Sequence, residues 1–335
     1  MVEEVAESEG LPQFDLSSSG TLVYRRRREA GRVVVRVDPS GKVERITPAP
    51  GGFITPRFSP DGKRLAVVEI SGVQRRILIY DLARGVANRL TLDDRAQIVP
   101  AWTPDGQYVV YQSAETMLAV RADGAGQPQP FLTKDERTTL SFSADGKRAV
   151  GSRQNTQTNR SEIWIAPVEN TPGGLRFGKP VTVASSPGLQ DEPVFSPDGR
   201  FIAYMSNESG TYQVYVVSLT PDGRAAGGKW QISNPTGYNP VWPTGGGQVF
   251  YDDGVSGQIH VVSYTANGDS FAAAPPRPWS PRPVSHYIAK MYDVAADGKQ
   301  MVGILDDDST PPETHLRLTL NFGDEIRRRL AGAAK

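Results

Sequence analysis

The sequence predicts an all-β propeller, because one turn recurs along the whole chain at blade-sized intervals. Seven segments align without gaps around this turn, and the glycines that close them are 40 to 53 residues apart. That period is typical of propeller blades and is longer than a leucine-rich or ankyrin repeat. The segments are QFDLSSSG (13–20), TPRFSPDG (55–62), VPAWTPDG (99–106), TLSFSADG (139–146), EPVFSPDG (192–199), NPVWPTGG (239–246) and MYDVAADG (291–298).

The residues of the turn have a physical reason to be there. Proline presets φ, aspartate tolerates the bridge region, and glycine takes the left-handed conformation that closes a hairpin. We therefore predict positive φ at Gly62 and Gly199.

Each turn is followed by β-branched and aromatic runs of four to seven residues, which indicate strands. Second strands are expected at 21–24, 64–68, 108–111, 201–206 and 248–251. Third strands are expected at 32–37, 77–82, 118–123, 162–168, 214–219, 259–264 and 315–320. Short fourth strands end the first six repeats, at 43–47, 88–91, 129–133, 180–183, 230–233 and 277–280.

These elements predict one domain, 1–335, built as a seven-bladed propeller; a six-bladed ring is the alternative. The blades are expected at about 10–47, 53–91, 97–133, 138–183, 190–233, 238–280 and 290–321. The seventh repeat lacks a fourth strand, and VEEVAE (2–7) is expected to supply it, so that N-terminal strand exchange closes the ring and removes the last sheet edges. Residues 322–335 are expected to form a short helix and tail.

Composition excludes several classes of protein. The chain has 37 basic and 37 acidic residues, which argues against a nucleic-acid binder or a polybasic membrane-surface protein. Cysteine is absent, so a disulfide scaffold, a zinc–thiolate site and a cysteine nucleophile are excluded. No apolar run is long enough to span a membrane, and the acidic N-terminus shows no signal peptide. We expect a monomer.

No pattern in the sequence predicts a catalytic residue, a metal or a cofactor. The segment 173–180 has the glycine and lysine spacing of a phosphate loop, but Pro180 stands where a hydroxyl is needed and a strand follows instead of a helix. A Gly-x-Ser-x-Gly elbow is missing. The three histidines, His260, His286 and His315, fall in different segments without metal-ligand spacing.

The inner strands predict a binding site near the central channel. Each inner strand has an apolar residue at the position of Phe58 and another two residues earlier. The position between these two is charged in neighbouring repeats, at Asp15, Arg57 and Asp293, and apolar in others. This row predicts either an ion pair that helps to close the ring or a polar patch for a ligand or peptide. Four residues that stand two positions before this mixed position in their own strands are expected nearer the channel mouth: Gln13, Thr55, Glu192 and Asn239.

The SPDG-type turns followed by (I/L)-A-(Y/V) resemble the WD40-like PD40 repeats of TolB-type propellers. FDLSSSGTLVYR, the block FSPDGRFIAYMSNESGTYQVYVVSL, KWQIS and the ending LRLTLNFGDEIRRRL resemble, more specifically, the C-terminal propeller of bacterial serine/threonine protein kinases. Asn321-Phe322 departs from the Asn-Trp usual there.

The resemblance implies a non-catalytic propeller that binds a protein or peptide as the sensor or scaffold part of a signalling protein. The location stays open: the chain as it stands would be cytoplasmic, and a propeller fused after a membrane span would be periplasmic. The alternatives are a hydrolase or lyase that uses the channel, and the propeller part of a prolyl-oligopeptidase-like peptidase.

Overall fold

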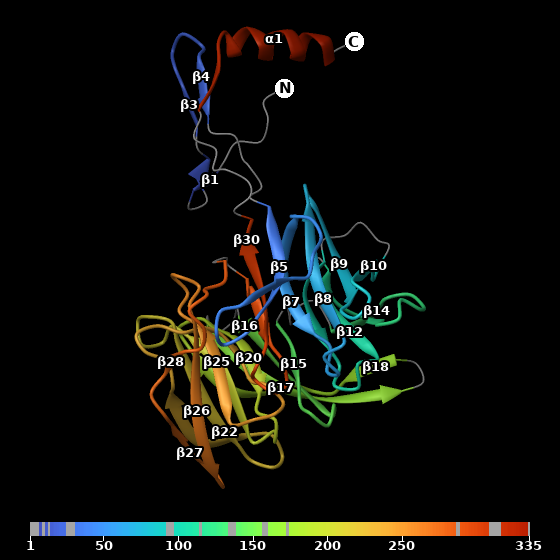
Figure 1. Ribbon diagram of the computed structural model, residues 1–335, viewed down its shortest axis with the longest axis vertical. Coiled ribbons are helices and arrows are strands. Elements are labelled where there is room, and N and C mark those ends of the chain that lie inside the picture. Colours follow the sequence, from blue (N-terminus) through green and yellow to red (C-terminus); the bar gives the residue numbers. More distant parts are fainter. Residues whose placement is uncertain are drawn as a thin grey trace. The chain divides into compact units, whose positions relative to one another are not determined.

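Strands form most of the regular structure in the computed structural model (Figure 1). The structure describes residues 7–8, 11–12, 14–24, 31–91, 97–113, 116–132, 139–155, 160–171, 174–285, 289–307 and 316–333. The chain divides into two units, which we call unit 1 (Met1–Gly31 with Asp307–Lys335) and unit 2 (Arg32–Asp306). Within the described ranges, no helix combines the length and the apolar character needed to cross a membrane.

Six antiparallel sheets of four or five strands make up the described part of unit 2. We number these blades one to six by their inner strands. Blade one consists of β7 (Gly52–Phe58), β8 (Arg64–Ser71), β9 (Gln74–Asp81) and β10 (Val86–Arg89). Blade two consists of β11 (Gln97–Trp102), β12 (Tyr108–Ser113), β13 (Thr116–Arg121) and β14 (Gln129–Leu132). Blade three consists of β15 (Ser141–Phe142), β16 (Arg148–Asn155), β17 (Arg160–Thr171), β18 (Gly174–Phe177) and β19 (Val181–Ser186). Blade four consists of β20 (Gln190–Phe195), β21 (Phe201–Ser206), β22 (Gln213–Leu219) and β23 (Ala225–Gln231).

Blade five is β24 (Tyr238–Val241), β25 (Gln248–Asp252), β26 (Ile259–Asn267), β27 (Ser270–Ala273) and β28 (Arg277–Pro278). Blade six combines strands from both ends of unit 2, namely β29 (Tyr292–Val294), β30 (Met301–Asp306), β5 (Arg32–Val37) and β6 (Val43–Arg45). Strands β30 and β5 pair from Met301↔Val37 to Asp306↔Arg32, and Figure 1 shows them side by side although their colours mark opposite ends of the chain. This pairing closes the ring.

The expected β-propeller is confirmed, and the described residues of unit 2 form six sheets. The first and last expected blades, 10–47 and 290–321, are not formed as such. Strands β3 (Phe14–Leu16) and β4 (Leu22–Tyr24) pair instead with β31 (Arg317–Thr319) in a three-stranded sheet of unit 1. The reason is that the repeat pattern marks a segment as a strand without specifying which strand it joins.

The N-terminal closing strand expected at 2–7 lies outside the described residues except for Glu7. That residue belongs to β1 (Glu7–Ser8), which pairs with β2 (Leu11–Pro12). N-terminal strand exchange does close the ring, but β5 and β6 carry it out. The expected C-terminal helix is present as α1 (Phe322–Ala333).

The turn at the end of each inner strand forms as expected. Gly62 and Gly199 have φ of 67° and 68°, so the prediction of positive φ is confirmed. In blade one the Gly62 N–H donates to Ser59 O at 2.8 Å, and the Ser59 hydroxyl donates to Asp61 Oδ1 at 2.5 Å.

The ring strands are buried because each blade is covered on both faces by its neighbours. In β8, for example, Leu65, Ala66, Val67 and Val68 are all fully buried, although their side chains alternate between the two faces of the sheet. Apolar clusters join blade one to blades two and six, and further clusters continue between the other neighbouring blades. The core therefore lies between blades, which leaves the inner strands free to line a channel.

Candidate functional site

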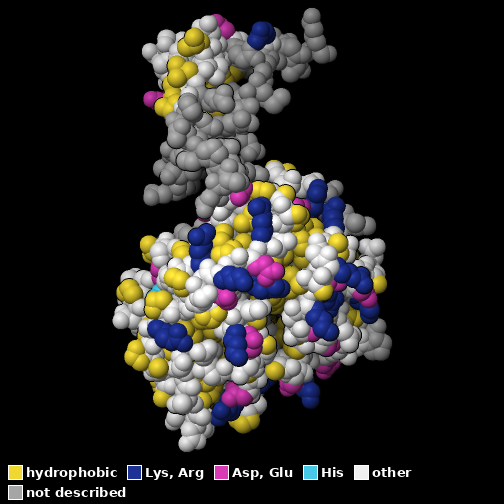
Figure 2. Space-filling model, viewed as in Figure 1, with side chains coloured by type: hydrophobic (Ala, Val, Ile, Leu, Met, Phe, Trp, Pro, Cys, Tyr) yellow, Lys and Arg dark blue, Asp and Glu magenta, His cyan; other side chains and the backbone are white. Residues whose placement is uncertain are grey.

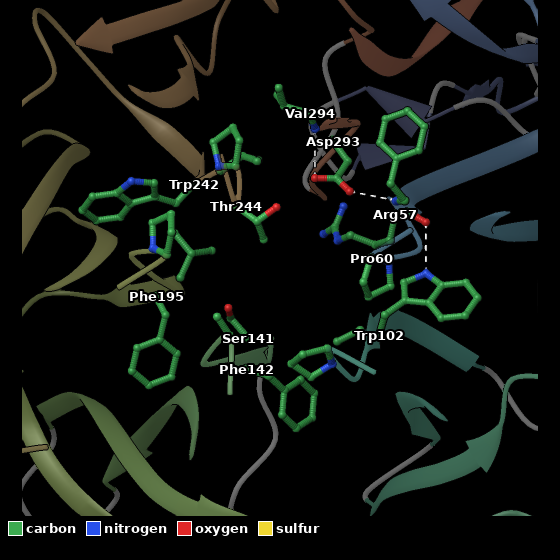
Figure 3. A pocket seen from close by; sticks show the side chains of 18 of the residues that line it. Arg57, Pro60, Trp102, Ser141, Phe142, Phe195, Trp242, Thr244, Asp293 and Val294 are labelled. Atoms are coloured by element: carbon green, nitrogen blue, oxygen red, sulfur yellow. Dashed lines mark hydrogen bonds between the residues drawn. The ribbon is translucent and has the colours of Figure 1, made fainter. Parts of the chain in front are cut away.

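A cavity of about 310 Å³ opens at the end of the channel where the repeat turns gather (Figure 3). All six blades contribute to it. Its rim is a collar formed by the second residue of each turn: Pro60, Pro104, Ala144, Pro197, Thr244 and Ala296. The apolar residues near the end of each inner strand also border the cavity, and the labelled aromatic rings point away from its centre (Figure 3): Phe58, Trp102, Phe142, Phe195, Trp242 and Val294.

This layering follows directly from the repeat. The turn proline presets φ and faces the rim, while the apolar residue two positions before it ends the inner strand. Hydrogen bonds fix two of the aromatic rings, since Trp102 Nε1 donates to Arg57 O at 3.1 Å and Trp242 Nε1 donates to Tyr264 Oη at 3.1 Å. The wall of the cavity is therefore rigid and largely apolar.

One side of the cavity floor is charged, because Arg57 of blade one and Asp293 of blade six lie next to each other there (Figure 3). Asp293 accepts a hydrogen bond from the Phe58 N–H at 2.8 Å and another from the Val294 N–H at 3.0 Å. Arg57 Nη1 donates to Pro56 O at 2.8 Å. Burial raises the pKa of Asp293, and Arg57 opposes this shift.

The opposite side of the floor is apolar, with Val194 of blade four and Val241 of blade five in the positions equivalent to Arg57. Several hydroxyl-bearing residues also line the cavity, among them Ser141 and Thr244 (Figure 3). A ligand held here would meet charge on one side and hydrocarbon on the other.

A buried ion pair lies beside the cavity, and one of its members, Lys290, is also a lining residue. Lys290 Nζ of blade six is 2.8 Å from Glu192 Oε2 of blade four, and it also donates to Pro240 O of blade five at 2.9 Å. Thr139, which precedes the inner strand of blade three, donates to Glu192 Oε1 at 3.0 Å. Burial acts to raise the pKa of Glu192, but Lys290 and Arg57 outweigh it, so that the pKa lies below its ordinary value. Burial lowers the pKa of Lys290.

Further buried carboxyls accept hydrogen bonds from the protein itself. Asp252 Oδ2 accepts from Asn239 Nδ2 at 2.8 Å, and Asp191 Oδ1 accepts from the Ser152 hydroxyl at 2.6 Å. Burial raises the pKa of both carboxyls. The Tyr292 hydroxyl donates to Asn239 O at 2.8 Å. Within the described residues, no group of three His, Asp or Glu side chains is arranged to hold a metal ion.

The structure separates the seven residues that the sequence predicted as a site. Arg57 and Asp293 line the cavity, while Thr55, Glu192 and Asn239 are not among its lining residues. These three have positive φ (49°, 53° and 50°) because each sits at a β-bulge of its inner strand. The mouth opens instead beside the turn prolines, since the repeat alone does not tell which end of the strand faces a cavity.

Asp15 belongs to β3 of unit 1 and is exposed, whereas the other described site residues belong to unit 2. Gln13, His286 and His315 are outside the described residues. Lys290 was missed by the sequence reasoning. Its position, four residues before the apolar inner-strand row of the last repeat, carries no special pattern, so only the fold reveals it.

Comparisons with known proteins agree with this architecture. No family model matches the chain. The Tol-Pal system protein TolB of Bordetella pertussis is 28% identical over 197 residues, which cover 58% of this chain and 40% of the relative. The chain thus matches about two fifths of the length of that relative. A solved TolB-type structure from Agrobacterium tumefaciens superposes with a TM-score of 0.59 over 82% of this chain and 98% of that one, at 18% identity.

The chain has a TolB-like β-propeller fold. The same fold also occurs among enzymes, because an oligogalacturonate lyase from Vibrio parahaemolyticus matches with a TM-score of 0.52 over 93% of this chain and 82% of the lyase, at 14% identity. The TolB-like fold by itself therefore does not distinguish a binding protein from an enzyme. The function has to be argued from the residues that line the cavity.

Proposed function

We propose that this chain is a non-catalytic binding module that holds a segment of a partner protein at the mouth of the TolB-like propeller. The observation that carries the proposal is that the charged groups in and beside the cavity already have partners within the protein. Glu192 and Lys290 bind each other, and Asp293 accepts two backbone N–H groups. These charges therefore stabilise the ring and support a rigid apolar collar, which suits binding more than chemistry.

The cavity indicates what kind of segment it would take. Its volume, about 310 Å³, is at the lower end of the range for small-molecule pockets and accommodates about two side chains. The proline and alanine side chains of the collar fit an apolar side chain, while Arg57 provides a cation on one side and Ser141 and Thr244 provide hydroxyls. We therefore expect an apolar anchor residue next to an acidic or hydrogen-bonding one.

The finer proposal is that the module serves as the sensor or scaffold part of a bacterial serine/threonine kinase protein. Its support is the resemblance of the NESG, KWQIS and C-terminal segments to the propellers appended to such kinases. Two of the bacterial proteins named above carry TolB names, and one of these is named as a protein of the Tol-Pal system, which supports a protein partner in either setting.

The test begins with selection of peptides from a displayed random library on the purified full chain. Selected peptides are then titrated against Ser141→Trp, which places an indole in the cavity, and against Ser209→Trp, a matched change in an exposed turn outside it. We expect affinity to fall by about tenfold or more for Ser141→Trp alone. Equal affinity for both variants and the wild type would contradict the proposed site.

An enzyme that uses the channel is the second candidate, because the buried Asp293 carboxyl has a raised pKa at the floor of the cavity, beside Arg57. A screen for hydrolase and lyase turnover on the purified chain tests it. Turnover that is lost in Asp293→Asn, while the variant keeps the wild-type melting temperature, would replace the binding proposal with the enzyme.

A further inference from the structure

Arg57 differs from many basic residues on the surface of unit 2, because no carboxylate of the described residues forms an ion pair with it. Figure 2 shows basic and acidic side chains interspersed on one face of this unit, and several of them are paired. Arg200 Nη2, for example, lies 2.7 Å from Asp198 Oδ2. The half-buried guanidinium of Arg57 instead faces the cavity.

Most of the hydrogen-bonding capacity of Arg57 is unused. A guanidinium group has five N–H donors on three nitrogens. Only Nη1 is engaged in Arg57, since it donates to Pro56 O at 2.8 Å and to Tyr292 O at 3.4 Å. Within the described part of the chain, the Nε and Nη2 atoms form no hydrogen bond. These two atoms are the edge of the guanidinium that a carboxylate binds at two points.

Two hydroxyl groups in the cavity are unused as well. The hydroxyls of Ser59 and Ser196 donate to the turn aspartates, and the hydroxyl of Thr139 donates to a carboxylate outside the cavity lining. The hydroxyls of Ser141 and Thr244 form no hydrogen bond with any described residue. The lining residues that carry a hydroxyl are Ser59, Thr139, Ser141, Ser196 and Thr244.

The three groups with unused donors surround the centre of the cavity. Arg57 belongs to blade one, Ser141 to blade three and Thr244 to the turn of blade five, so they come from alternate blades. Figure 3 shows their side chains pointing toward the open centre. A group held there meets hydrogen-bond donors from three sides. A carboxylate, which only accepts hydrogen bonds, matches such a set of donors.

Asp293 opposes an anion by its charge, but its oxygens are already used. They accept the N–H groups of Phe58 and Val294 at 2.8 and 3.0 Å. Burial raises the pKa of Asp293, which favours its neutral form. Lys290, the other basic lining residue, lies against Glu192, so the charges of this pair offset each other. Arg57 therefore determines the sign of the ligand.

The Lys290–Glu192 ion pair crosses the channel beside the cavity. Its two side chains are 5% and 10% exposed, and their hydrogen bonds extend to blades three and five. A polypeptide that passed right through the channel would have to separate this pair, which leaves two unpaired charges. A ligand therefore enters and leaves the cavity on the side of the collar.

A chain end fits this cavity better than a loop does. The volume of about 310 Å³ takes about two side chains. A chain that turned round inside the cavity would need room for a turn of four residues. A chain end needs room for one strand only, and a carboxyl terminus also supplies a carboxylate at its tip.

We propose that the cavity is a receptor for the carboxyl terminus of a polypeptide. The terminal carboxylate binds Arg57 Nε and Nη2 at two points and accepts hydrogen bonds from the Ser141 and Thr244 hydroxyls. The last side chain packs against Val194 and Val241 on the apolar side of the floor. This inference rests on the proposed binding function and specifies its ligand.

Two random peptide libraries displayed on a carrier protein provide ligands for the purified full chain. The peptides have free carboxyl ends in the first library, and free amino ends with blocked carboxyl ends in the second. We expect the first library to yield peptides that bind the wild type and not Ser141→Trp. Peptides of this kind from the second library alone would overturn the inference and leave the binding module intact. If neither library yields them, the binding module fails together with the inference.

The best peptide is then synthesised as the free acid, as the C-terminal amide, and as the free acid extended by one glycine. The amide removes the terminal charge, whereas the glycine keeps the charge and moves the carboxylate beyond the last side chain. We expect each change to weaken binding about tenfold or more in isothermal titration. Equal affinity of the three peptides would overturn the inference. A single N-acetylated amino acid that binds as tightly as the peptide would also overturn it, because the ligand would then be a small carboxylic acid.

Arg57→Gln identifies the group that binds the carboxylate. The free acid should bind this variant about tenfold more weakly than the wild type, whereas the amide should bind both equally. Arg84→Gln, at an exposed position outside the cavity, is the control and should bind both peptides as the wild type does. If Arg57→Gln does not fold, Arg57→Lys replaces it, since lysine keeps the charge and loses the two-point geometry. An equal loss for acid and amide would show that Arg57 does not bind the terminal carboxylate.

Discussion

Lys290 Nζ of blade six lies 2.8 Å from Glu192 Oε2 of blade four, across the channel that the six inner strands surround. The two side chains are 5% and 10% exposed. Pro240 O of blade five and the Thr139 hydroxyl of blade three complete their hydrogen bonds. Four blades are thus joined at one buried point.

Removing one partner of this pair should destabilise the protein strongly, because the other charge would stay buried and unpaired. We expect Glu192→Leu and Lys290→Met each to lower the free energy of unfolding by about 3–5 kcal/mol, and the double variant to lose much less than the sum. Arg84→Ala is the control, since its ion pair with Asp81 is exposed and should contribute less than about 1 kcal/mol. Additive losses in a denaturant-unfolding double-mutant cycle would contradict this account.

The turn glycines should differ in their tolerance of a side chain. Gly62→Val is expected to cost about 1–3 kcal/mol from its positive φ alone, because nothing lies within 4 Å of an added Cβ. Gly199→Val should cost more, since the added Cβ would lie 2.6 Å from Arg148 Nη2, which donates to Gly199 O. Thermal unfolding of the two variants measures the difference, and a smaller loss for Gly199→Val would show that Arg148 moves away freely.

Closure of blade six predicts the effect of two truncations. A chain of residues 32–306 keeps all six sheets and should unfold cooperatively. A chain of residues 48–306 loses β5 and β6, leaves the β30 edge unpaired, and should lose several kcal/mol or fail to fold. Circular dichroism melts compare them. Equal melting temperatures would show that β5 does not close the ring.

The turn aspartates predict an acid-dependent loss of stability. The Ser59 hydroxyl bond to Asp61 is the largest influence on the pKa of that carboxyl, which lies below its ordinary value of 3.8. A lowered pKa in the folded state stabilises the fold above the unfolded pKa, and this stability is lost as the pH falls through the folded pKa. Asp61→Ala should therefore cost about 1 kcal/mol near pH 6 and progressively less below pH 3.8. A pH-independent difference in urea unfolding would contradict it.

Charge reversal at Arg57 should affect binding more than folding. In Arg57→Glu the cavity floor would present two acidic groups, so a selected peptide with an acidic residue should bind about tenfold or more weakly at low salt. Arg84→Glu, at an exposed position outside the cavity, provides a matched control. Isothermal titration measures affinity and thermal unfolding measures stability. Unchanged affinity in Arg57→Glu would remove Arg57 from the binding surface.

Part of the candidate site was predictable because it follows from the repeat. The spacing of two between Phe58 and turn position 60 recurs in every repeat, so the sequence predicts that equivalent residues of all blades meet at the same end of the channel. Lys290 was not predictable, because its partner Glu192 is 98 residues away and comes close only when blades four and six face the same axis. Asp15 was grouped with Arg57 and Asp293 on the assumption that repeats adjacent in sequence are adjacent blades.

The sequence by itself determined the strands, the turns and the propeller class, because turn chemistry and β-branched runs act over a few residues each. Only the tertiary structure decided that β30 pairs with β5, that β4 pairs with β31, and which end of the channel holds the cavity. Strands from equivalent positions of two repeats have nearly the same pattern of side chains. The choice between them therefore depends on long-range packing and ring closure, which no local pattern contains.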